Sequence, residues 1–390
     1  MHVGIDATSW DNERGFGRFT RSLVSALAAR DTGFRYTLLF DRAPERPVPD
    51  SVEINIAGAR QSMSEASSGA KARGGADMLT LSRAAKGLGA DLFFFPAHYS
   101  FYPIFSRVPK LVCIHDTIPE RFPDLIFPTK RNFLLWQAKT RLALFQARRV
   151  LTVSDASAKD ISEILGVRRD RIDVTTEGPF EAFRPIDDQA RLAAVRARHD
   201  IADGDRLLVY VGGFNRHKNV LRLIEAMPEI LDACPDARLA IVGRITGDRF
   251  WDNVEELTAG AARDARASGR ISFTGEIDDA ELAELLAGAE ALVLPSLWEG
   301  FGLPAVEAMA CGTPVLASDR GSLPEVVGDA GLLFDPERTE DIAKAATRLL
   351  SEAPFRVDLR RNALARAKTF TWNRSAELVE GAFRRTAATS

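Results

Sequence analysis

Cysteine is scarce in the sequence, with three residues among 390. Cys113, Cys234 and Cys311 lie far apart in apolar stretches, without C-x-x-C spacing and without histidines at zinc-binding spacing. This pattern argues against a disulfide framework and against a zinc module, and it indicates reduced core thiols in a cytosolic protein.

Long apolar runs and a strong excess of one charge are also missing. No window approaches the roughly 18 apolar residues of a membrane-spanning helix, and Met1 leads directly into the strand-like HVGID, so we expect neither a transmembrane segment nor a secretory signal. The net charge of −3 argues against general nucleic-acid binding. Residues 1–185 nevertheless hold 26 Lys and Arg against 21 Asp and Glu (+5), and the remainder holds 25 against 33 (−8). The first half therefore favours an anionic partner.

The length and the composition, 46% hydrophobic and 27% charged, suit two soluble α/β domains. Strand-like runs alternate with helical stretches or loops throughout the chain: HVGID, YTLLF, DLFFF, KLVCI and RVLTV, then RLLVYVG, ARLAIVG, RISFT, EALVL and PVLA. This alternation predicts two doubly wound, Rossmann-like domains with parallel sheets. We place them at residues 1–183 and 190–373, joined by the aperiodic FEAFRPIDDQ, and expect a final helix at 374–390 to pack on the first domain.

Two further segments each allow two interpretations. Residues 59–77 are small and polar, which predicts a mobile exposed loop, with a lid over an acceptor as the alternative. Residues 128–149 form a basic helical stretch whose apolar stripe is expected in the core. The alternative is a basic amphipathic helix that lies on an anionic membrane.

The stretch EGFGLPAVE carries the main chemical signal. It follows the buried strand ALVLP, so it lies at the carboxyl end of a parallel strand, where ligands bind in such sheets. Pro304 suits the start of a helix, and the free amides there, with Gly300 and Gly302 beside them, suit a diphosphate. Glu299 and Glu307 flank the turn. A bare phosphate would not favour two acids, whereas the hydroxyl groups of a sugar nucleotide would donate to both.

Other stretches place cations, glycines and a histidine after predicted strands. Arg216 and Lys218 follow the first strand of the second domain, where they would stabilise a departing phosphate. Gly15 and Gly17 follow the first strand of the chain and would allow close backbone approach to the ligand. His115 follows KLVCI, and Ser154 is expected to cap the next helix.

PSLWEGFGLPAVEAMACGTPVLAS resembles the Glu-x7-Glu signature of the retaining glycosyltransferases of family 4, and this family has the GT-B fold of two Rossmann-like domains that face each other across a cleft. GFGRFT, CIHDTIPERFP, LTVSDASAKDI, YVGGFNRHKNV and FTGEIDDAEL are similar to other family segments and occur in the expected order. The chain departs from the family at Gly212 and Gly213, where an arginine often follows the first glycine.

The resemblance implies a hexosyltransferase that acts with retention, in which His115, Glu299, Arg216 and Lys218 are catalytic. The implied donor-binding residues are Gly15, Gly17, Gly213, Arg216, Lys218, Ile277, Glu299, Gly300, Phe301, Gly302, Leu303 and Glu307. No metal and no cofactor is expected, because the cations would replace a divalent ion and the Asp-x-Asp at 203–205 suits a turn.

HDTIPERFP favours GDP-mannose as donor, with a UDP-sugar as the alternative. A glycan or lipid-linked acceptor is expected, in the cytoplasm or at the inner face of the membrane. A sugar-nucleotide epimerase or a non-catalytic nucleotide-sugar binder remains an alternative on the same architecture, while a dinucleotide dehydrogenase lacks its glycine motif. Donor base, acceptor, linkage and oligomeric state are not encoded in these motifs.

Overall fold

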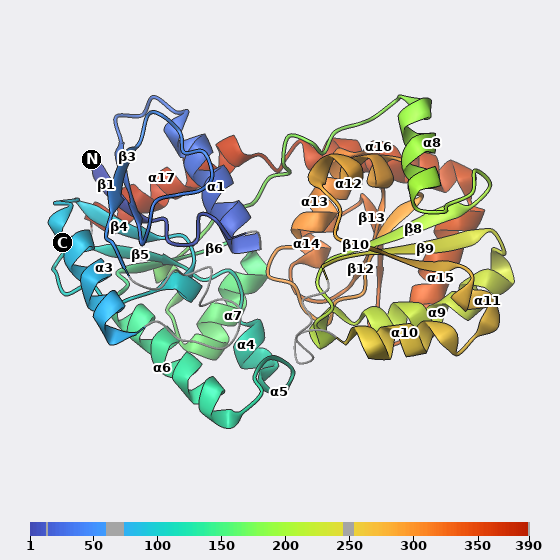
Figure 1. Cartoon of the computed structure of the whole chain (residues 1–390), viewed down its shortest axis with the longest axis horizontal. Coiled ribbons are helices and arrows are strands. Elements are labelled where there is room, and N and C mark those ends of the chain that lie inside the picture. The colour runs from blue at the N-terminus through green and yellow to red at the C-terminus, as the bar shows by residue number, and fades with distance from the viewer. Residues whose placement is uncertain (13–14, 60–73, 245–252, 389–390) are drawn as a thin grey trace. The chain divides into compact units, whose positions relative to one another are not determined.

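The computed structural model describes residues 1–12, 15–59, 74–244 and 253–388. The chain forms two compact units, each a parallel sheet covered by helices (Figure 1). Unit 1 comprises Met1–Thr117, Thr129–Glu177 and Trp372–Ser390, and unit 2 comprises Ile118–Pro128 and Gly178–Thr371. This division differs from the predicted ranges at residues 118–128 and 178–183, which belong to unit 2, and at residues 372–373, which belong to unit 1.

Unit 1 contains a seven-stranded sheet in the order β3-β2-β1-β4-β5-β6-β7. Its parallel pairings confirm a doubly wound topology. Edge strands β3 and β7 were not predicted, because β3 is largely exposed and β7 has three residues. The strands are β1 (His2–Asp6), β2 (Arg35–Phe40), β3 (Glu53–Ile56), β4 (Leu92–Phe95), β5 (Lys110–Cys113), β6 (Arg149–Thr152) and β7 (Ile172–Val174).

Both faces of this sheet are covered by helices, which explains the continuous apolar run of β4. Phe94 points to one face, where its ring lies 5.3 Å from that of Phe383 on α17. Phe93 and Phe95 point to the other face, in a core shared with α3, α6 and α7. The helices of unit 1 are α1 (Gly15–Ala28), α3 (Gly75–Gly87), α6 (Lys130–Gln146), α7 (Asp155–Leu165) and α17 (Trp372–Ala388).

The predicted final helix is confirmed as α17, and it packs against α1 within unit 1. Its apolar residues Ala376, Val379 and Phe383 are fully buried. Ser154 caps α7 as predicted, because its hydroxyl accepts from the Ser157 amide at 2.9 Å. Residues 60–73 of the predicted 59–77 loop lie outside the described residues, and residues 75–77 are the start of α3 rather than loop.

Unit 2 contains a six-stranded sheet in the order β10-β9-β8-β11-β12-β13, again with parallel pairings. The unpredicted strand is β13, whose residues are mostly half-exposed because it is an edge strand. The strands are β8 (Arg206–Val211), β9 (Ala237–Val242), β10 (Ile271–Gly275), β11 (Ala291–Leu294), β12 (Val315–Ser318) and β13 (Gly331–Phe334).

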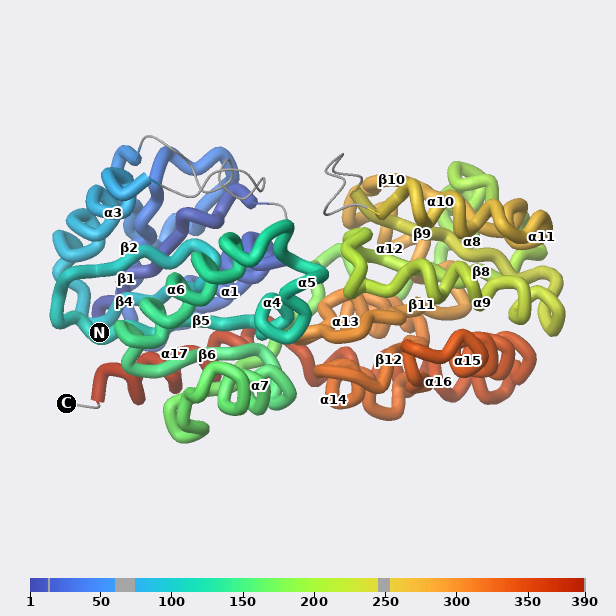
Figure 2. Tube along the Cα trace, turned by 90° about the horizontal axis from the view of Figure 1, so that it is seen from below, coloured from blue at the N-terminus to red at the C-terminus, as the bar shows by residue number. Residues whose placement is uncertain are grey.

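Helices α9 and α15 pack on each other and on one face of this sheet, and α13 packs on α16 and on strands β11 and β12 (Figure 2). In the predicted connection, residues 180–189, residues 180–188 contain no helix or strand, and Gln189 begins α8. The helices of unit 2 are α4 (Ile118–Arg121), α5 (Pro123–Ile126), α8 (Gln189–Arg198), α9 (Val220–Ala233), α10 (Val254–Ala262), α11 (Ala265–Ser268), α12 (Asp279–Ala287), α13 (Leu303–Ala310), α14 (Leu323–Val327), α15 (Thr339–Ser351) and α16 (Ala353–Ala367).

The expectation that the apolar stripe of residues 128–149 lies in the core is wrong. The segment forms α6, but the buried residues of this helix are Thr140 and Ala143. Leu134, Leu135, Leu142 and Phe145 are exposed to solvent. Ala143 and the half-buried Leu144 of this helix pack in the core of unit 1, whereas the four exposed side chains point outward.

Candidate functional site

The strand order of unit 2 reverses between β8 and β11, and in doubly wound sheets ligands bind outside the carboxyl ends of the strands at this point. β8 leads into residues 212–219, and β11 leads into residues 295–302. The motif predicted from EGFGLPAVE and the predicted cations therefore meet at the switch point of the sheet. The sequence of either stretch alone does not show that the two stretches meet, because β8 and β11 become neighbours only through the strand order of the sheet.

Lys218 and Glu299 form the centre of this site. Lys218 Nζ donates to both carboxylate oxygens of Glu299, at 2.8 and 3.0 Å, and the Ser296 hydroxyl donates to Glu299 Oε1 at 2.6 Å. Burial acts to raise the pKa of Glu299, but the charge and hydrogen bonds of Lys218 and the bond from Ser296 outweigh it, so the pKa lies below the usual value. The site therefore holds an ionised carboxylate against a fixed cation.

Two more bonds tie the loop after β8 to the loop after β11. The Leu297 amide donates to the His217 carbonyl at 2.8 Å, and the Asn219 side chain donates to the Pro295 carbonyl at 3.0 Å. Asn219 adopts a left-handed conformation, with φ of 56°, at the start of α9. Consecutive residues of one loop thus hold the other loop, which fixes the position of Lys218 relative to Glu299.

The glycines around Glu299 are required by close packing. Gly302 has φ of 93° and precedes α13 without a side-chain cap. Pro304 has no amide hydrogen and the Ala305 amide donates to the Gly302 carbonyl at 2.9 Å, so among the first three residues of the helix the Leu303 amide is the one that could bind a ligand. Gly321 has φ of 61°, and a Cβ there would lie 2.6 Å from the Glu299 carbonyl oxygen. The Ser322 hydroxyl bonds the carbonyls of Glu299 and Phe301, at 3.1 and 2.8 Å. Gly321 and Ser322 therefore contact the loop from Glu299 to Phe301 and hold it in position.

The other residues of this loop and of α13 that were predicted to bind the donor differ in burial and in the contacts of their side chains. Glu307 is buried in the second turn of α13, which begins at Leu303. Burial, with the charge of Glu307, raises the pKa of Cys311 to about 12. Phe301 is buried with its ring 5.7 Å from that of Phe370, so its side chain serves packing. Gly300 is buried beside it, and Leu303 is half-buried.

Three other residues were predicted to bind the donor, but they contact other partners or lie on another loop than Lys218 and Glu299. Arg216 is exposed and forms an ion pair with Glu256 of α10, at 3.0 Å. The carbonyl of exposed Gly213 accepts from the Tyr210 hydroxyl at 2.6 Å. Ile277 is half-buried in the loop after β10, an edge strand that β9 separates from β8. The structure therefore brings Lys218, and not Arg216, to Glu299.

His115 belongs to unit 1, where it follows β5. Its Nε2 lies 2.9 Å from the Pro96 carbonyl oxygen, and its Nδ1 lies 3.6 Å from Glu177 Oε1. Burial acts to lower the pKa of His115, but Cys113 and Glu177 outweigh burial and raise it well above the usual value. Both ring nitrogens thus have partners within unit 1, while the main-chain carbonyl accepts from the Ser157 hydroxyl at 2.9 Å.

The glycine loop after β1 becomes the first turn of α1. A Cβ on Gly17 would lie 2.1 Å from the Asn12 carbonyl oxygen, so the need for glycine here comes from packing within unit 1. A Cβ on Gly15 would meet nothing within 4 Å. A donor-binding role for these two glycines stays a prediction.

Sequence reasoning missed several residues that shape the site, because long-range contacts leave no local pattern. These residues are Ser296 and Asn219, described above, and Arg121, whose guanidinium lies 3.7 Å from the Trp298 ring centre. The Arg121 contact joins the HDTIPERFP segment to the residue before Glu299 within unit 2. In the sequence, the one sign of this contact is that Arg121 belongs to HDTIPERFP, a segment that resembles the family.

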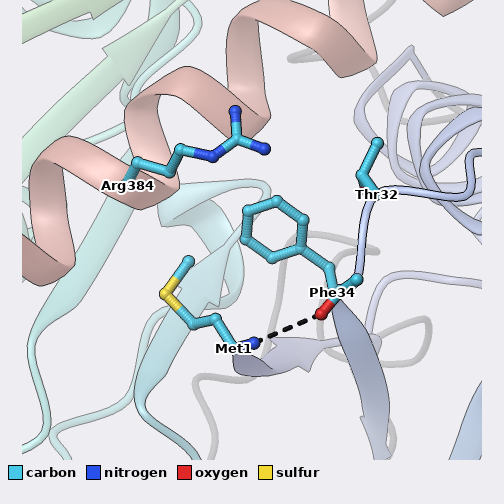
Figure 3. A pocket seen from close by; sticks show the side chains of 5 residues that line it. Met1, Thr32, Phe34 and Arg384 are labelled. Atoms are coloured by element: carbon cyan, nitrogen blue, oxygen red, sulfur yellow. Dashed lines mark hydrogen bonds between the residues drawn. The ribbon is translucent and has the colours of Figure 1, made fainter.

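The described residues contain no group of three or more His, Cys, Asp or Glu that could hold a metal ion. A pocket of 210 Å³, lined by Met1, Thr32, Gly33, Phe34 and Arg384, lies at the amino end of β1 (Figure 3). The Met1 amino group donates to the Gly33 carbonyl there, at 3.3 Å. This pocket is smaller than typical ligand sites and lies at the opposite edge of the sheet from the carboxyl ends of the strands, so it is not the candidate site.

Comparison with known families covers most of the chain. Residues 193–366 match the model described as Glycosyl transferases group 1, and residues 14–178 match Glycosyltransferase Family 4. O-antigen chain mannosyltransferase B of Escherichia coli is 34% identical over 230 residues, covering 59% of this chain and 58% of the relative. Serotype-specific mannosyltransferase WbdA of Escherichia coli is 27% identical over 413 residues, covering 98% of this chain and 48% of the relative. The chain thus spans about half the length of these curated relatives.

Solved structures share the fold of the whole chain. Sucrose-phosphate synthase from Thermosynechococcus elongatus superposes with a TM-score of 0.76 at 21% identity and covers 100% of both chains. Anabaena Alr3699/HepE, solved in complex with UDP and glucose, has a TM-score of 0.75 at 20% identity and covers 99% of this chain and 100% of its own. At this level of identity the similarity establishes the fold, two parallel Rossmann-like sheets of the GT-B type.

Proposed function

Because the chain belongs to the family 4 glycosyltransferases, we propose that it transfers a hexose, with mannose as the best candidate, from a nucleoside-diphosphate sugar to an acceptor hydroxyl. The observation that carries this proposal is the Lys218–Glu299 pair, which lies at the switch point of the second sheet and precedes the uncapped start of α13. A diphosphate needs a fixed cation and free amides, and a sugar ring needs a carboxylate acceptor. The site offers the cation, the carboxylate and the main-chain amide of Leu303 within one loop pair.

The proposed mechanism is a substitution on one face of the sugar, with retention at the anomeric carbon. The bond from this carbon to the leaving phosphate oxygen breaks, the acceptor oxygen bonds the same carbon, and the phosphate takes the acceptor proton. Lys218 and the Leu303 amide at the start of α13 stabilise the charge that grows on the phosphate. Glu299 keeps Lys218 in place and accepts from the sugar hydroxyls. Arg216 contributes once it leaves Glu256, and no metal ion takes part.

GDP-mannose is the proposed donor. The support is the HDTIPERFP segment together with the two mannosyltransferase relatives, whose names describe those proteins. The proposed acceptor is a glycan or a lipid-linked glycan, and the proposed location is the cytoplasm, with peripheral contact at the inner face of the membrane. No helix among the described residues is long and apolar enough to cross a bilayer.

A transfer assay tests the proposal. We expect radiolabelled sugar to pass from GDP-mannose to a mannose-containing acceptor in the presence of a chelator, and NMR of the product to show the anomeric configuration of the donor. UDP-glucose serves as the competing donor in a parallel reaction. Inverted configuration contradicts the same-face mechanism, and transfer from UDP-glucose alone contradicts the proposed donor. Donor turnover without an acceptor would favour an epimerase.

A further inference from the structure

Helix α6 of unit 1 presents its large apolar side chains to solvent. The exposed fractions are 63% for Leu134, 60% for Leu135, 41% for Leu142 and 86% for Phe145. Leu134, Leu142 and Phe145 follow one another at intervals of eight and three residues, which places them on one stripe of the helix. Contiguous exposed apolar side chains on a folded domain mark an interaction surface.

The opposite side of α6 is anchored to the unit, so the outward stripe is fixed in place. Thr140 and Ala143 are buried there, and the Trp136 ring lies 4.9 Å from His98 and 5.0 Å from Tyr99. Lys139 Nζ donates to the Tyr99 carbonyl. A rotation of the helix that would bury the leucines would break these contacts.

A second segment extends the apolar surface at the end of α6. Phe105 is 67% exposed, and its neighbour Ile104 donates its amide to the side chain of Gln146, the last residue of α6, at 2.9 Å. Phe105 and Phe145 therefore lie at the same end of the helix. We call the surface formed by Phe105, Leu134, Leu135, Leu142 and Phe145 the α6 face. Figure 2 shows α6 across the front of unit 1.

The charged side chains of α6 itself all have one sign. Between Asp124 and Asp155 the chain contains no acidic residue and six cationic ones, Lys130, Arg131, Lys139, Arg141, Arg148 and Arg149. Lys130, Arg131 and Arg141 are exposed on the same helix as the leucines. A second copy of the chain packed face to face would bring these cations together, which costs free energy. An anionic bilayer instead supplies negative head groups beside an apolar layer.

We propose that the α6 face binds the surface of an anionic lipid bilayer, with its leucines and phenylalanines in the acyl boundary and its cations among the head groups. This surface belongs to unit 1 and contains none of the donor-site residues of unit 2, so its binding requires neither donor nor transfer. It would bring unit 1 to a membrane without a spanning helix.

Sedimentation with vesicles tests the proposal. We expect the wild-type chain to sediment with vesicles of phosphatidylglycerol and phosphatidylcholine at low salt, and to bind pure phosphatidylcholine much more weakly. The variant Leu134→Ser/Phe145→Ser should lose about a hundredfold in partition coefficient, because burial of each side chain is worth at least about tenfold. Arg131→Glu/Arg141→Glu should lose the preference for the anionic lipid.

A matched control removes exposed apolar side chains from helices elsewhere. Ile164→Ser/Val357→Ser changes residues of α7 and α16 that are 39% and 63% exposed, and it should sediment as the wild type does. Absence of wild-type binding, or unchanged binding by Leu134→Ser/Phe145→Ser, overturns the proposal. So does a wild-type dimer that this variant converts to a monomer in analytical ultracentrifugation, since the face would then join two copies. Thermal stabilisation by GDP should be equal in all variants, which separates this test from that of the proposed reaction.

Discussion

Replacement of Lys218 with alanine is expected to lower kcat by about a hundredfold or more, which is the usual effect of removing one group that stabilises the developing charge. Lys218 is the cation that the structure holds against Glu299, through bonds of 2.8 and 3.0 Å. Its removal takes a positive charge from the leaving phosphate and frees the Glu299 side chain, which is 12% exposed. Glu299→Gln should lower kcat in the same way, because it weakens the hold on Lys218. Steady-state kinetics with the donor at saturation measures both effects.

A second ion pair of unit 2 provides the control for loss of stability. Arg270 lies 2.5 Å from Asp205, with side chains 36% and 7% exposed, and both residues precede strands, at the opposite end of the sheet. Arg270→Ala should lower the unfolding midpoint as Lys218→Ala does while kcat stays close to the wild-type value. Near-normal turnover in both Lys218→Ala and Glu299→Gln would refute the assigned roles.

Acidification from pH 7 to pH 5 is expected to lower the free energy of unfolding by about 2 kcal/mol through His217 alone. Burial, and next the charge of Lys218, lower the pKa of His217 to about 4. The unfolded chain binds a proton near pH 6.5, whereas folded His217 stays neutral until about pH 4. Its contribution to stability is therefore fully present above pH 6.5 and is lost progressively as the pH falls from 6.5 towards 4.

Urea unfolding of the wild type and of His217→Gln at both pH values measures this contribution. The side chain alone is changed, so the bond from the Leu297 amide to the carbonyl of residue 217 is kept. The variant should lose about 2 kcal/mol less than the wild type on acidification. An equal loss in the two proteins would contradict a neutral, buried His217 beside Lys218.

Much of the fold could be predicted from local pattern. Buried central strands such as LFFF of β4 and ALVL of β11 have strong apolar runs because helices cover both faces. The edge strands β3, β7 and β13 escaped prediction, since their stability comes from one neighbouring strand and their residues are short or mixed in polarity. The face of α6 was predicted wrongly for a related reason. Amphipathic periodicity indicates two different faces, but it does not indicate which of them packs on the sheet.

The candidate site was predictable where its residues share a short motif. Glu299, Gly302 and the start of α13 lie within one stretch, so residue type and strand position sufficed. Ser296, Asn219 and the Arg121–Trp298 contact depend on which loops the topology brings together, and no spacing encodes that. For Gly17, the sequence showed the need for glycine but not its cause, which is the Asn12 carbonyl oxygen.

Thermal unfolding with increasing GDP or UDP tests the central claim most directly, namely that the Lys218–Glu299 site of unit 2 binds the diphosphate of a sugar nucleotide. A ligand that binds only the folded chain raises the unfolding midpoint with the logarithm of its concentration. We expect such a rise for the wild type and for Arg270→Ala, and a rise in Lys218→Ala that begins only at about tenfold or higher nucleotide concentration. No rise with either nucleotide in the wild type, or an identical rise in Lys218→Ala, would contradict this claim.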